Sequence, residues 1–389
     1  YTGLYQYAMY WDGDLELWPL ESNPSVYEGH IHSNGDIYLG AGRANFDIIG
    51  SVTAAGHIYN TPKEPSIEDN GSVRIADLDG RFHSLNYDWR DSNWVEQSLD
   101  DWDGLVMDSS HGVQAAPYPI QTLPDPIQII KPGDPFSDDS LERRLRFRYR
   151  AGLKILDSES IYSDSLDTES TFAPGIITRD SVYDFREGHD MEMRTLNMGA
   201  LIDSGYAPAN GVIYLSYSDA NAAVRIKNAS RLPIGGLVIA TDNPCYIWGD
   251  YNTINKQPSS IFCDALNLYS VNWSDANDNG NLNTRNADNT WVNTCVVAGS
   301  DTTTLGDYSG GATSLIRLHE RWSSNDQLTF RGSLVCLWVS EQATGDFEDA
   351  SFWEHHRNSG FDPELLDPEF WPEYSFWNSQ VMRGSWRSF

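Results

Sequence analysis

A short repeat near the start of the chain constrains the fold more than any other feature. Residues 29–38 (GHIHSNGDIY) align with residues 50–59 (GSVTAAGHIY) at an offset of 21 residues. In each copy, a strand of alternating apolar and small polar residues ends at a glycine turn, and a second strand begins with Ile-Tyr. Self-similarity at a fixed period indicates stacked coils, and a coil of this length matches one turn of a parallel β-solenoid.

Short apolar segments in the second half follow the same pattern without a strict repeat. Gly, Asn, Asp or Pro separate the predicted strands, which are 211–215, 223–226, 237–240, 245–248, 260–263, 292–298 and 332–337. Such spacing also suits a β-sandwich, which is the structural alternative. We predict a mainly β protein with a right-handed parallel β-solenoid-like core, irregular loops and an extended C-terminal arm.

The order of these patterns divides the chain into four parts. Residues 1–120 form an N-terminal β-solenoid part, and residues 201–345 form a second one. Between them, residues 121–200 contain a proline-rich linker followed by an arginine-rich helix or insert. Residues 346–389 make an aromatic C-terminal arm.

The arginine-rich segment, residues 140–152, carries five arginines within eight residues. Leu141, Leu145 and Tyr149 lie four apart, and this spacing predicts a helix. Apolar residues and arginines also alternate here, so a strand is the alternative. The arginines either form a solvated face paired with local carboxylates or contact another subunit or an anionic glycan.

Composition excludes several classes of function. The chain has 56 acidic and 26 basic residues, a net charge of −30, and such a field repels a phosphate backbone, so we expect no nucleic-acid partner. With 40% apolar residues and 14 tryptophans, the chain is not a disordered acidic polymer. No apolar run approaches the ~20 residues of a membrane span. Because the sequence starts at Tyr1, we expect any export signal or anchor to have preceded it.

Four cysteines lie at positions 245, 263, 295 and 336. No pair forms CxxC or CxxCH, which excludes the usual attachment of a c-type haem. Nine histidines form no cluster with the cysteines, so we expect no structural zinc. Two disulfides and four buried free thiols are both compatible with this spacing.

An ordered series of motifs resembles a known family. The motifs are HSNGDIYLG (32–40), VTAAG (52–56), YDFREG (183–188), IWGDYN (247–252), CDALN (263–267) and RGSLV (331–335). The series is similar to large bacterial surface proteins described as pilus-assembly proteins with a pilin-like N-terminal helix, over about residues 5–345. Members usually carry a hydrophobic N-terminal helix, which this sequence lacks. The resemblance implies an extracellular or cell-surface structural role and supplies no catalytic residues.

Two segments resemble the signatures of trypsin-like serine proteases. They are residues 53–57 (TAAGH) and 306–311 (GDYSGG), and each is interrupted by one inserted residue, Gly56 or Tyr308. An inserted residue redirects a side chain that a catalytic triad needs to align. Acidic residues are abundant, and no pair stands out by its spacing as the catalytic pair of a glycan hydrolase or lyase. We therefore expect no enzyme activity and assign no catalytic or cofactor-binding residues.

One loop suggests a calcium site. Residues 275–281 (DANDNGN) place oxygen ligands at alternate positions, Asp275, Asn277 and Asn279, as an EF-hand loop does. The twelfth position is Asn286 instead of the bidentate glutamate of that loop. An ordinary Asn/Asp/Gly turn needs no ion, so the calcium site is an alternative reading of this loop.

Aromatic residues gather at both ends of the chain. Eleven of them lie in residues 347–389, where prolines 363, 368 and 372 disfavour a regular helix or a central strand. Such a tail must be buried, so we expect an extended arm that docks on another copy, with the aromatic N-terminus as the receiving surface. The alternative is that the arm only caps its own last coil. The predicted interface residues are Tyr5, Tyr7, Tyr10, Trp11, Trp353, Trp371, Trp377 and Trp386.

These observations converge on a structural role. The open ends of a solenoid expose unpaired strand edges, which must be capped or used for assembly. Head-to-tail contact without closure produces a fibre. We predict a non-enzymatic subunit of an extracellular filament, pilus or surface layer, with copies of itself as partners and a surface glycan as a further one. The alternative is a glycan-binding or glycan-cleaving β-helix protein.

Overall fold

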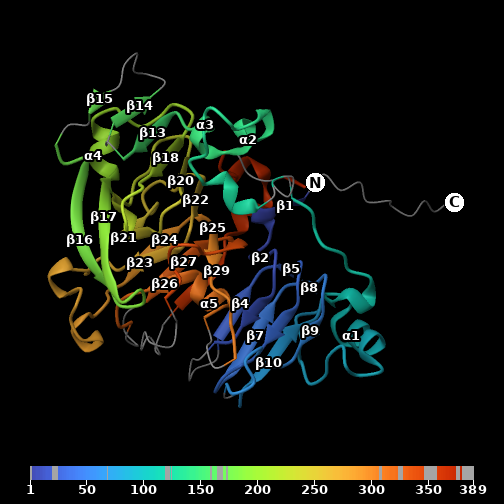
Figure 1. Cartoon of the computed structure of the whole chain (residues 1–389). Coiled ribbons are helices and arrows are strands. Elements are labelled where there is room, and N and C mark those ends of the chain that lie inside the picture. The colour runs from blue at the N-terminus through green and yellow to red at the C-terminus, as the bar shows by residue number, and fades with distance from the viewer. Residues whose placement is uncertain are drawn as a thin grey trace.

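The protein is mainly β, and its strands pair into two long sheets of mostly parallel strands (Figure 1). The computed structural model describes residues 2–19, 25–67, 69–118, 123, 125–157, 160–163, 170–171, 174–305, 309–322, 327–345, 357–373 and 377–378. Within these residues the larger sheets have twelve and nine strands, and two of the nine, β23 and β26, lie beside the main path of their sheet. Parallel pairing along both sheets argues against the β-sandwich alternative, which is built from antiparallel strands.

The N-terminal stack consists of three-strand units that lie on top of one another. Its strands are β2 (Met9–Trp11), β3 (Leu15–Leu17), β4 (Ser25–Glu28), β5 (Ile31–Ser33), β6 (Ile37–Leu39), β7 (Asn45–Ile49), β8 (Val52–Ala54), β9 (Ile58–Tyr59), β10 (Ser72–Ala76) and β12 (Val106–Met107). Ile31 pairs with Val52 and Ile37 pairs with Ile58, both in parallel. The two copies of the repeat therefore stack with the predicted offset of 21 residues.

Glycine is required where the units turn. Gly29 and Gly50 occupy equivalent corners of successive units, with φ of 120° and 144°. A Cβ at Gly50 would lie 2.2 Å from the carbonyl oxygen of Gly29. Backbones that approach this closely at positive φ leave no room for a side chain, which explains why both copies of the repeat begin with glycine.

The C-terminal stack continues the twelve-stranded sheet and contributes most strands of the nine-stranded one. Its strands are β18 (Val212–Ser216), β19 (Ala222–Ala229), β20 (Leu237–Thr241), β21 (Cys245–Tyr251), β22 (Ser259–Cys263), β23 (Leu266–Tyr269), β24 (Thr290–Asn293), β25 (Cys295–Ser300), β26 (Ile316–Leu318), β27 (Leu328–Gly332), β28 (Leu334–Val339) and β29 (Arg357–Phe361). The short elements α5 (Ala312–Leu315), η5 (Asp275–Asn277) and η6 (Leu282–Thr284) lie between them. Most apolar strand residues are buried here, as the sequence pattern predicts, whereas Trp291 and Val339 are exposed.

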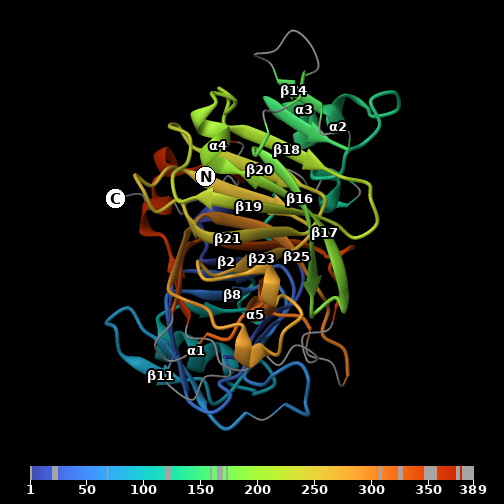
Figure 2. The ribbon, with the colours of Figure 1, turned by 90° about the vertical axis from the view of Figure 1, so that its left-hand side faces the viewer.

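The two stacks meet in the middle of the twelve-stranded sheet. Strand β2 lies between β5 and β28, with Met9 opposite both Ile31 and Leu334. Figure 2 shows the strands stacked from β18 near one end to β8 near the other. The first strands of the chain therefore lie in the middle of the twelve-stranded sheet, and the N-terminal stack extends from there to one end of the sheet. The chain then runs to the opposite end, and the C-terminal stack extends from that end back to the middle. The parts predicted at 1–120 and 201–345 share one sheet and one hydrophobic core.

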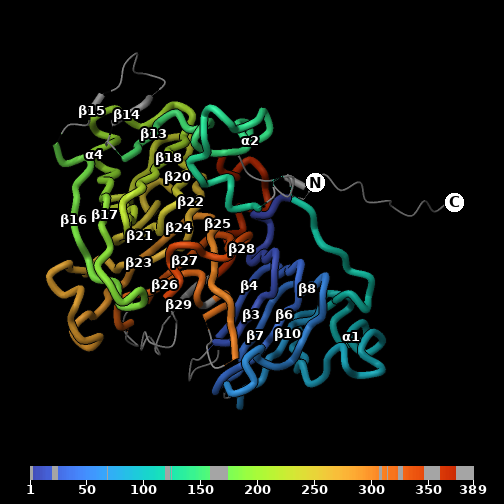
Figure 3. The backbone as a smooth tube through the Cα atoms, in the orientation of Figure 1, coloured from blue at the N-terminus to red at the C-terminus, as the bar shows by residue number. Residues whose placement is uncertain are grey.

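Much of the segment predicted as a linker and insert, residues 121–200, belongs to the sheets. Strand β13 (Leu153–Leu156) extends the twelve-stranded sheet, and β16 (Ile177–Asp184) and β17 (His189–Asn197) form a long hairpin on the nine-stranded one. The remaining elements are η4 (Pro126–Ile129), α2 (Ser140–Leu145), α3 (Phe147–Arg150), β14 (Ser160–Ser163), β15 (Ser170–Thr171) and α4 (Met198–Asp203). Figure 3 shows that the chain runs from the region of α1, at one end of the stack, toward α2 near the other end.

The arginine-rich segment is helical, but the helix is interrupted at Arg146, whose ψ is 132°. Arg146 is buried and pairs with Asp138 at 3.2 Å and with Glu142 at 3.2 Å. Its guanidinium also donates to the carbonyl of Gln128 at 2.7 Å. Local carboxylates therefore do pair with this arginine, although its side chain is in the interior and not on a solvated face.

Both ends of the twelve-stranded sheet are covered. At one end, α1 (Trp94–Trp102) contacts β12, and β11 (Phe82–Ser84) pairs antiparallel with β10. At the other end, the antiparallel strands β14 and β15 follow β13. A covering helix and very short edge strands prevent edge-to-edge pairing. In the nine-stranded sheet, the eight-residue strand β16 is an edge strand, so edge pairing is disfavoured only at the ends of the twelve-stranded sheet.

The four cysteines are free and buried. Burial raises the pKa of the Cys245 and Cys336 thiols to about 12. Of the two alternatives left by the sequence, the structure has the buried free thiols.

Candidate functional site

The C-terminal segment, defined here as residues 357–373, lies along the body of its own chain. Strand β29 pairs in parallel with β27, with Arg357 opposite Leu328 and Phe361 opposite Gly332. Two 3-10 turns follow, η7 (Pro363–Leu366) and η8 (Pro368–Phe370). Each begins at a proline preceded by an aspartate whose carboxylate accepts a backbone N–H of the turn. The prolines thus exclude a long helix here, as predicted.

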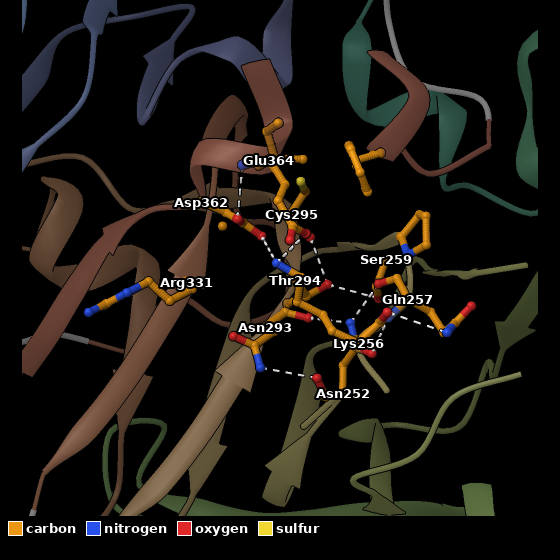
Figure 4. Close-up of a pocket in the computed structure, with 14 residues that line it drawn as sticks. Asn252, Lys256, Gln257, Ser259, Asn293, Thr294, Cys295, Arg331, Asp362 and Glu364 are labelled. Atoms are coloured by element: carbon orange, nitrogen blue, oxygen red, sulfur yellow. Dashed lines mark hydrogen bonds and ion pairs between the residues drawn. The ribbon is translucent and has the colours of Figure 1, made fainter. Parts of the chain in front are cut away.

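A lysine on the body clamps the start of this segment (Figure 4). Lys256 Nζ lies 2.7 Å from Asp362 Oδ2 and 2.7 Å from Glu364 Oε2. Partial burial by itself lowers the pKa of Lys256, but hydrogen bonds to the two carboxylates outweigh it and raise this pKa. The lysine is therefore fully charged, and its two ion pairs join the body to the segment.

The corner that carries Lys256 is held by asparagines. Asn252 has a φ of 57°, a conformation that asparagine tolerates better than most residues. Its amide donates to the carbonyls of Gln257 at 2.7 Å and Asn293 at 2.9 Å. Asn293 in turn donates to the carbonyl of Asn252 at 3.0 Å. This ladder joins two successive units of the stack, so the position of the lysine is determined by the body.

A cavity of about 160 Å³ separates this corner from the C-terminal segment. Its walls include Lys256, which pairs with both Asp362 and Glu364, and Cys295, whose pKa burial raises far above its ordinary value. A thiol that stays protonated is a poor nucleophile. The residues around this cavity are therefore suited to holding the C-terminal segment in place.

The C-terminal segment is anchored by Trp371. Its indole is buried, and Nε1 donates to the carbonyl of Leu365 at 2.7 Å. The ring packs on the first residues of the chain, since a Cβ at Gly3 would lie 2.0 Å from its Cη2 atom. Leu4 and Tyr5, in and around η1 (Leu4–Gln6), share its hydrophobic cluster. Strand β30 (Trp377–Asn378) then pairs antiparallel with β1 (Thr2–Gly3).

The predicted interface residues divide into groups. Trp371 lies at the meeting point of the two ends, as expected, but on its own chain. Tyr5, Tyr10 and Trp11 are buried in the chain's own core, and their part in a subunit interface stays a prediction. Tyr10 and Trp11 are buried because β2 is a central strand of the twelve-stranded sheet, and Tyr5 lies in η1.

Tyr7, Trp353, Trp377 and Trp386 are the other predicted interface residues. Tyr7 is half-buried, and its ring lies 5.7 Å from that of Tyr10. Trp353 and Trp386 lie outside the described residues. Trp377 belongs to β30, but its side chain also lies outside what the structure describes.

The residues predicted to bind calcium lie in a different environment from an EF-hand loop. Asp275 and Asn277 form the 3-10 turn η5, and the backbone N–H of Asn279 donates to Asp278 at 2.6 Å. Asp275 accepts from the buried Arg225 at 2.7 and 3.1 Å. The Asp275 carboxylate is therefore already paired with the buried Arg225. Among the described residues, no group of three or more His, Cys, Asp or Glu side chains is arranged to hold a metal.

A buried charged cluster surrounds the tip of the β16–β17 hairpin, which carries the YDFREG motif. Asp184 accepts from the Tyr246 hydroxyl at 2.5 Å and from the backbone N–H of Arg186 at 2.8 Å. Burial would raise the pKa of Asp184, but His319, Tyr246 and other neighbours outweigh it and hold this pKa below its ordinary value. Burial lowers the pKa of His319 to about 4, so its imidazole is neutral at pH 7.

The same hairpin tip is fastened to the segment after β28. Glu187 pairs with Arg317 and accepts the backbone N–H of Gly345 at 2.9 Å. In the CDALN motif, Asp264 accepts the backbone N–H groups of Glu341 at 2.7 Å and Gln342 at 3.0 Å. The YDFREG and CDALN motifs therefore hold neighbouring backbone segments together through hydrogen bonds and an ion pair.

A Ser-His-Asp arrangement that the sequence did not suggest lies beneath α1. Ser98 Oγ is 2.6 Å from His111 Nε2, and His111 Nδ1 is 3.0 Å from Asp108 Oδ1. Ser98 is 0% exposed, and its hydroxyl also donates to the carbonyl of Val95 at 3.2 Å. A nucleophile must reach its substrate, which this serine does not. The arrangement joins α1 to η2 (Ser109–His111) and covers the end of the stack.

The segments that resemble protease signatures do not form this arrangement. His57 stacks on Trp89 at 4.0 Å and lies 3.4 Å from Asp108 Oδ2. Residues 306–308 of the other segment lie outside the described residues. No sequence signal could have revealed Ser98 and His111, because neither lies in a recognisable catalytic motif.

Comparison with known proteins places the chain in no family. No family model and no curated protein matches the sequence. Among solved structures, the chain is similar to the crystal structure of the competence-associated pilin ComZ from Thermus thermophilus, with 10% sequence identity and a TM-score of 0.33 over 96% of this chain and 73% of that one. In the part of the chain that the structure describes, no helix has the length and hydropathy needed to cross a membrane.

Proposed function

We propose that this protein is a non-enzymatic structural subunit of an extracellular filament, pilus or surface layer, with a parallel β-solenoid as its body. The observation that carries the proposal is the docking of the C-terminal segment, which adds a last strand to the nine-stranded sheet and inserts Trp371 against the first residues of the chain. Copies associate head to tail when each subunit gives this segment to its neighbour.

The covered ends of the twelve-stranded sheet favour exchange of the C-terminal segment between subunits over end-to-end stacking of solenoids. Since α1 and the short strands β14 and β15 lie at the ends of the twelve-stranded sheet, continuation of that sheet from one copy to the next is disfavoured. An exchanged segment makes the same contacts on a neighbour that it makes on its own body, so exchange needs no new surface. A chain of such exchanges that does not close on itself is a fibre.

Trp371 contributes most of the energy of this contact. Burial of a tryptophan side chain removes roughly 150–250 Å² from water and stabilises the contact by about 4–6 kcal/mol at ~25 cal/mol per Å². The ion pairs of Lys256 are partly exposed and contribute about 1 kcal/mol or less each. The strand pairing of β29 fixes the position and direction of the segment.

A disulfide trap tests the exchange. Thr2 and Asn378 are opposite partners in the β1–β30 pair, so the double variant Thr2→Cys/Asn378→Cys places two thiols within bonding range. Exchanged segments give a ladder of covalent multimers on a non-reducing gel when assembled protein is oxidised. The single-cysteine variants are the controls, because the four native thiols are buried.

Two outcomes contradict the proposal. Assembled protein that forms only intramolecular disulfides shows that the segment caps its own body. Native protein that negative-stain microscopy shows only as separate particles contradicts the structural role itself. Purified protein should also show no hydrolase or lyase turnover on a panel of neutral and acidic glycans, and reproducible turnover would favour the glycan-cleaving alternative.

A further inference from the structure

The N-terminal and C-terminal stacks are joined differently on different sides of the molecule. On one side β2 pairs with β28, so a single twelve-stranded sheet runs through both stacks. On a second side, the N-terminal stack has a four-stranded sheet in the order β11-β10-β7-β4, and the C-terminal stack has the nine-stranded sheet. Within the described residues, no backbone pairing connects these two sheets. The elements at their junction therefore determine how firmly the stacks are held on this side.

Strand β29 of the C-terminal segment lies at this junction (Figure 1). It pairs in parallel with β27 of the nine-stranded sheet. It also contacts β4, the outermost strand of the four-stranded sheet, with which it forms no backbone pairing. The residues of β29 are therefore hydrogen-bonded to one stack and packed against the other.

The side chain of Phe361, at the end of β29, makes this packing close. A Cβ at Gly29, the corner between β4 and β5, would lie 2.8 Å from Phe361 Cβ and 2.6 Å from Ala8 Cβ. Only glycine at this corner leaves room for the two side chains. The next residue, Asp362, donates its backbone N–H to the carbonyl of Gly332 on β27 at 3.3 Å. Two neighbouring residues of the segment thus contact the two stacks separately.

We infer that the C-terminal segment is a clasp, an element that closes the junction between the two stacks on this side. When the segment leaves, β4 becomes an open edge strand. The stacks stay joined through the β2–β28 pairing and through the contact of α5 with β3. An edge strand open to water frays more readily than a covered one, so release of the clasp loosens the four-stranded sheet locally and leaves the rest of the fold intact.

The clasp couples segment exchange to the rigidity of each subunit. This coupling rests on the proposed function, whereas the clasp itself is a property of a single chain. A subunit that has given its segment away and received none has an open junction. A subunit that receives the segment of a neighbour has the same junction closed again, because the exchanged segment makes the same contacts. Assembly by exchange therefore holds the two stacks of every receiving subunit together.

Hydrogen exchange of the full chain, followed by mass spectrometry, tests the clasp. In Phe361→Ala, amides of β4 and β7 should exchange about tenfold faster than in wild type or more, because the ring that packs on the Gly29 corner is gone. Amides of β2 and β28 should change less than about twofold, because their pairing does not depend on the segment. The matched control Phe370→Ala, at an exposed ring of the same segment, should leave both regions as in wild type.

The double variant Thr2→Cys/Asn378→Cys provides a second measurement, since its intramolecular disulfide keeps the segment on its own body. In monomeric protein, oxidation should slow exchange in β4, and the single-cysteine variants should show no such change.

Two results would overturn the clasp. One is exchange in β4 that neither Phe361→Ala nor the disulfide alters. The other is exchange in Phe361→Ala that rises equally in β4 and at the β2–β28 pairing, since the ring would then stabilise the whole fold and not the junction. Local loosening of β4 in a protein that never assembles would support the clasp and contradict only the proposed function, so the two failures are distinguishable.

Discussion

A single buried carboxyl group, Glu320, should make the stability of this protein depend on pH near neutrality. Glu320 follows β26, is buried, and accepts from the backbone N–H of Ser270 at 2.5 Å and from its hydroxyl at 2.7 Å. Burial raises the pKa of Glu320 to about 7 even though the two Ser270 bonds and Arg285 act to lower it. In the unfolded chain, the pKa of a glutamate is about 4.3.

The sign and size of the effect follow from this difference. Between about pH 4.3 and 7, the folded state binds more protons at Glu320 than the unfolded state does. The contribution is therefore fully present below this range and is lost as the pH rises through it. The difference between the two pKa values corresponds to about 4 kcal/mol of unfolding free energy, of which about 3 kcal/mol falls between pH 5 and pH 8.

Glu320→Gln should remove this dependence without disturbing the site. The glutamine carbonyl accepts from the Ser270 N–H, and its amide donates to the Ser270 hydroxyl, which then acts as an acceptor. Urea unfolding at pH 5 and pH 8 measures the change in the free energy of unfolding. Wild type should lose about 3 kcal/mol more than the variant between these two pH values.

The exposed Glu96→Gln is the matched control and should behave as wild type. The reasoning is refuted if Glu320→Gln loses as much stability as wild type over the same pH range. An equal loss would mean that another group dominates the titration.

Three further substitutions have definite outcomes. Trp371→Ala should abolish assembly in sedimentation velocity, whereas the adjacent Phe370→Ala, at a side chain 44% exposed, should not; assembly by both variants would contradict the anchoring role. Gly50→Ala should lower the free energy of unfolding more than Gly188→Ala, because the former combines a collision at 2.2 Å with positive φ and the latter has only the φ penalty of about 1 kcal/mol; equal losses would contradict this. Ser98→Ala should destabilise the protein by about 1–3 kcal/mol in urea unfolding, and an esterase activity that this variant abolished would show that the serine is a nucleophile.

The sequence by itself determined the features that depend on neighbouring residues. The alternation within 29–38 and 50–59 predicted strands, and their spacing predicted the register of Ile31 on Val52. This works because a parallel unit that returns above itself must use nearly the same number of residues each time. The prolines of the C-terminal segment likewise restrict the local backbone whatever surrounds it.

Only the tertiary structure decided which parts of the chain meet. Aromatic composition showed that Tyr10 and Trp371 must be buried, but not that one lies in the central sheet and the other against the chain's own N-terminus. The pairing of β2 with β28 joins residues more than 300 positions apart. The local sequence shows that a residue must be buried, whereas the residues against which it packs depend on the path of the whole chain.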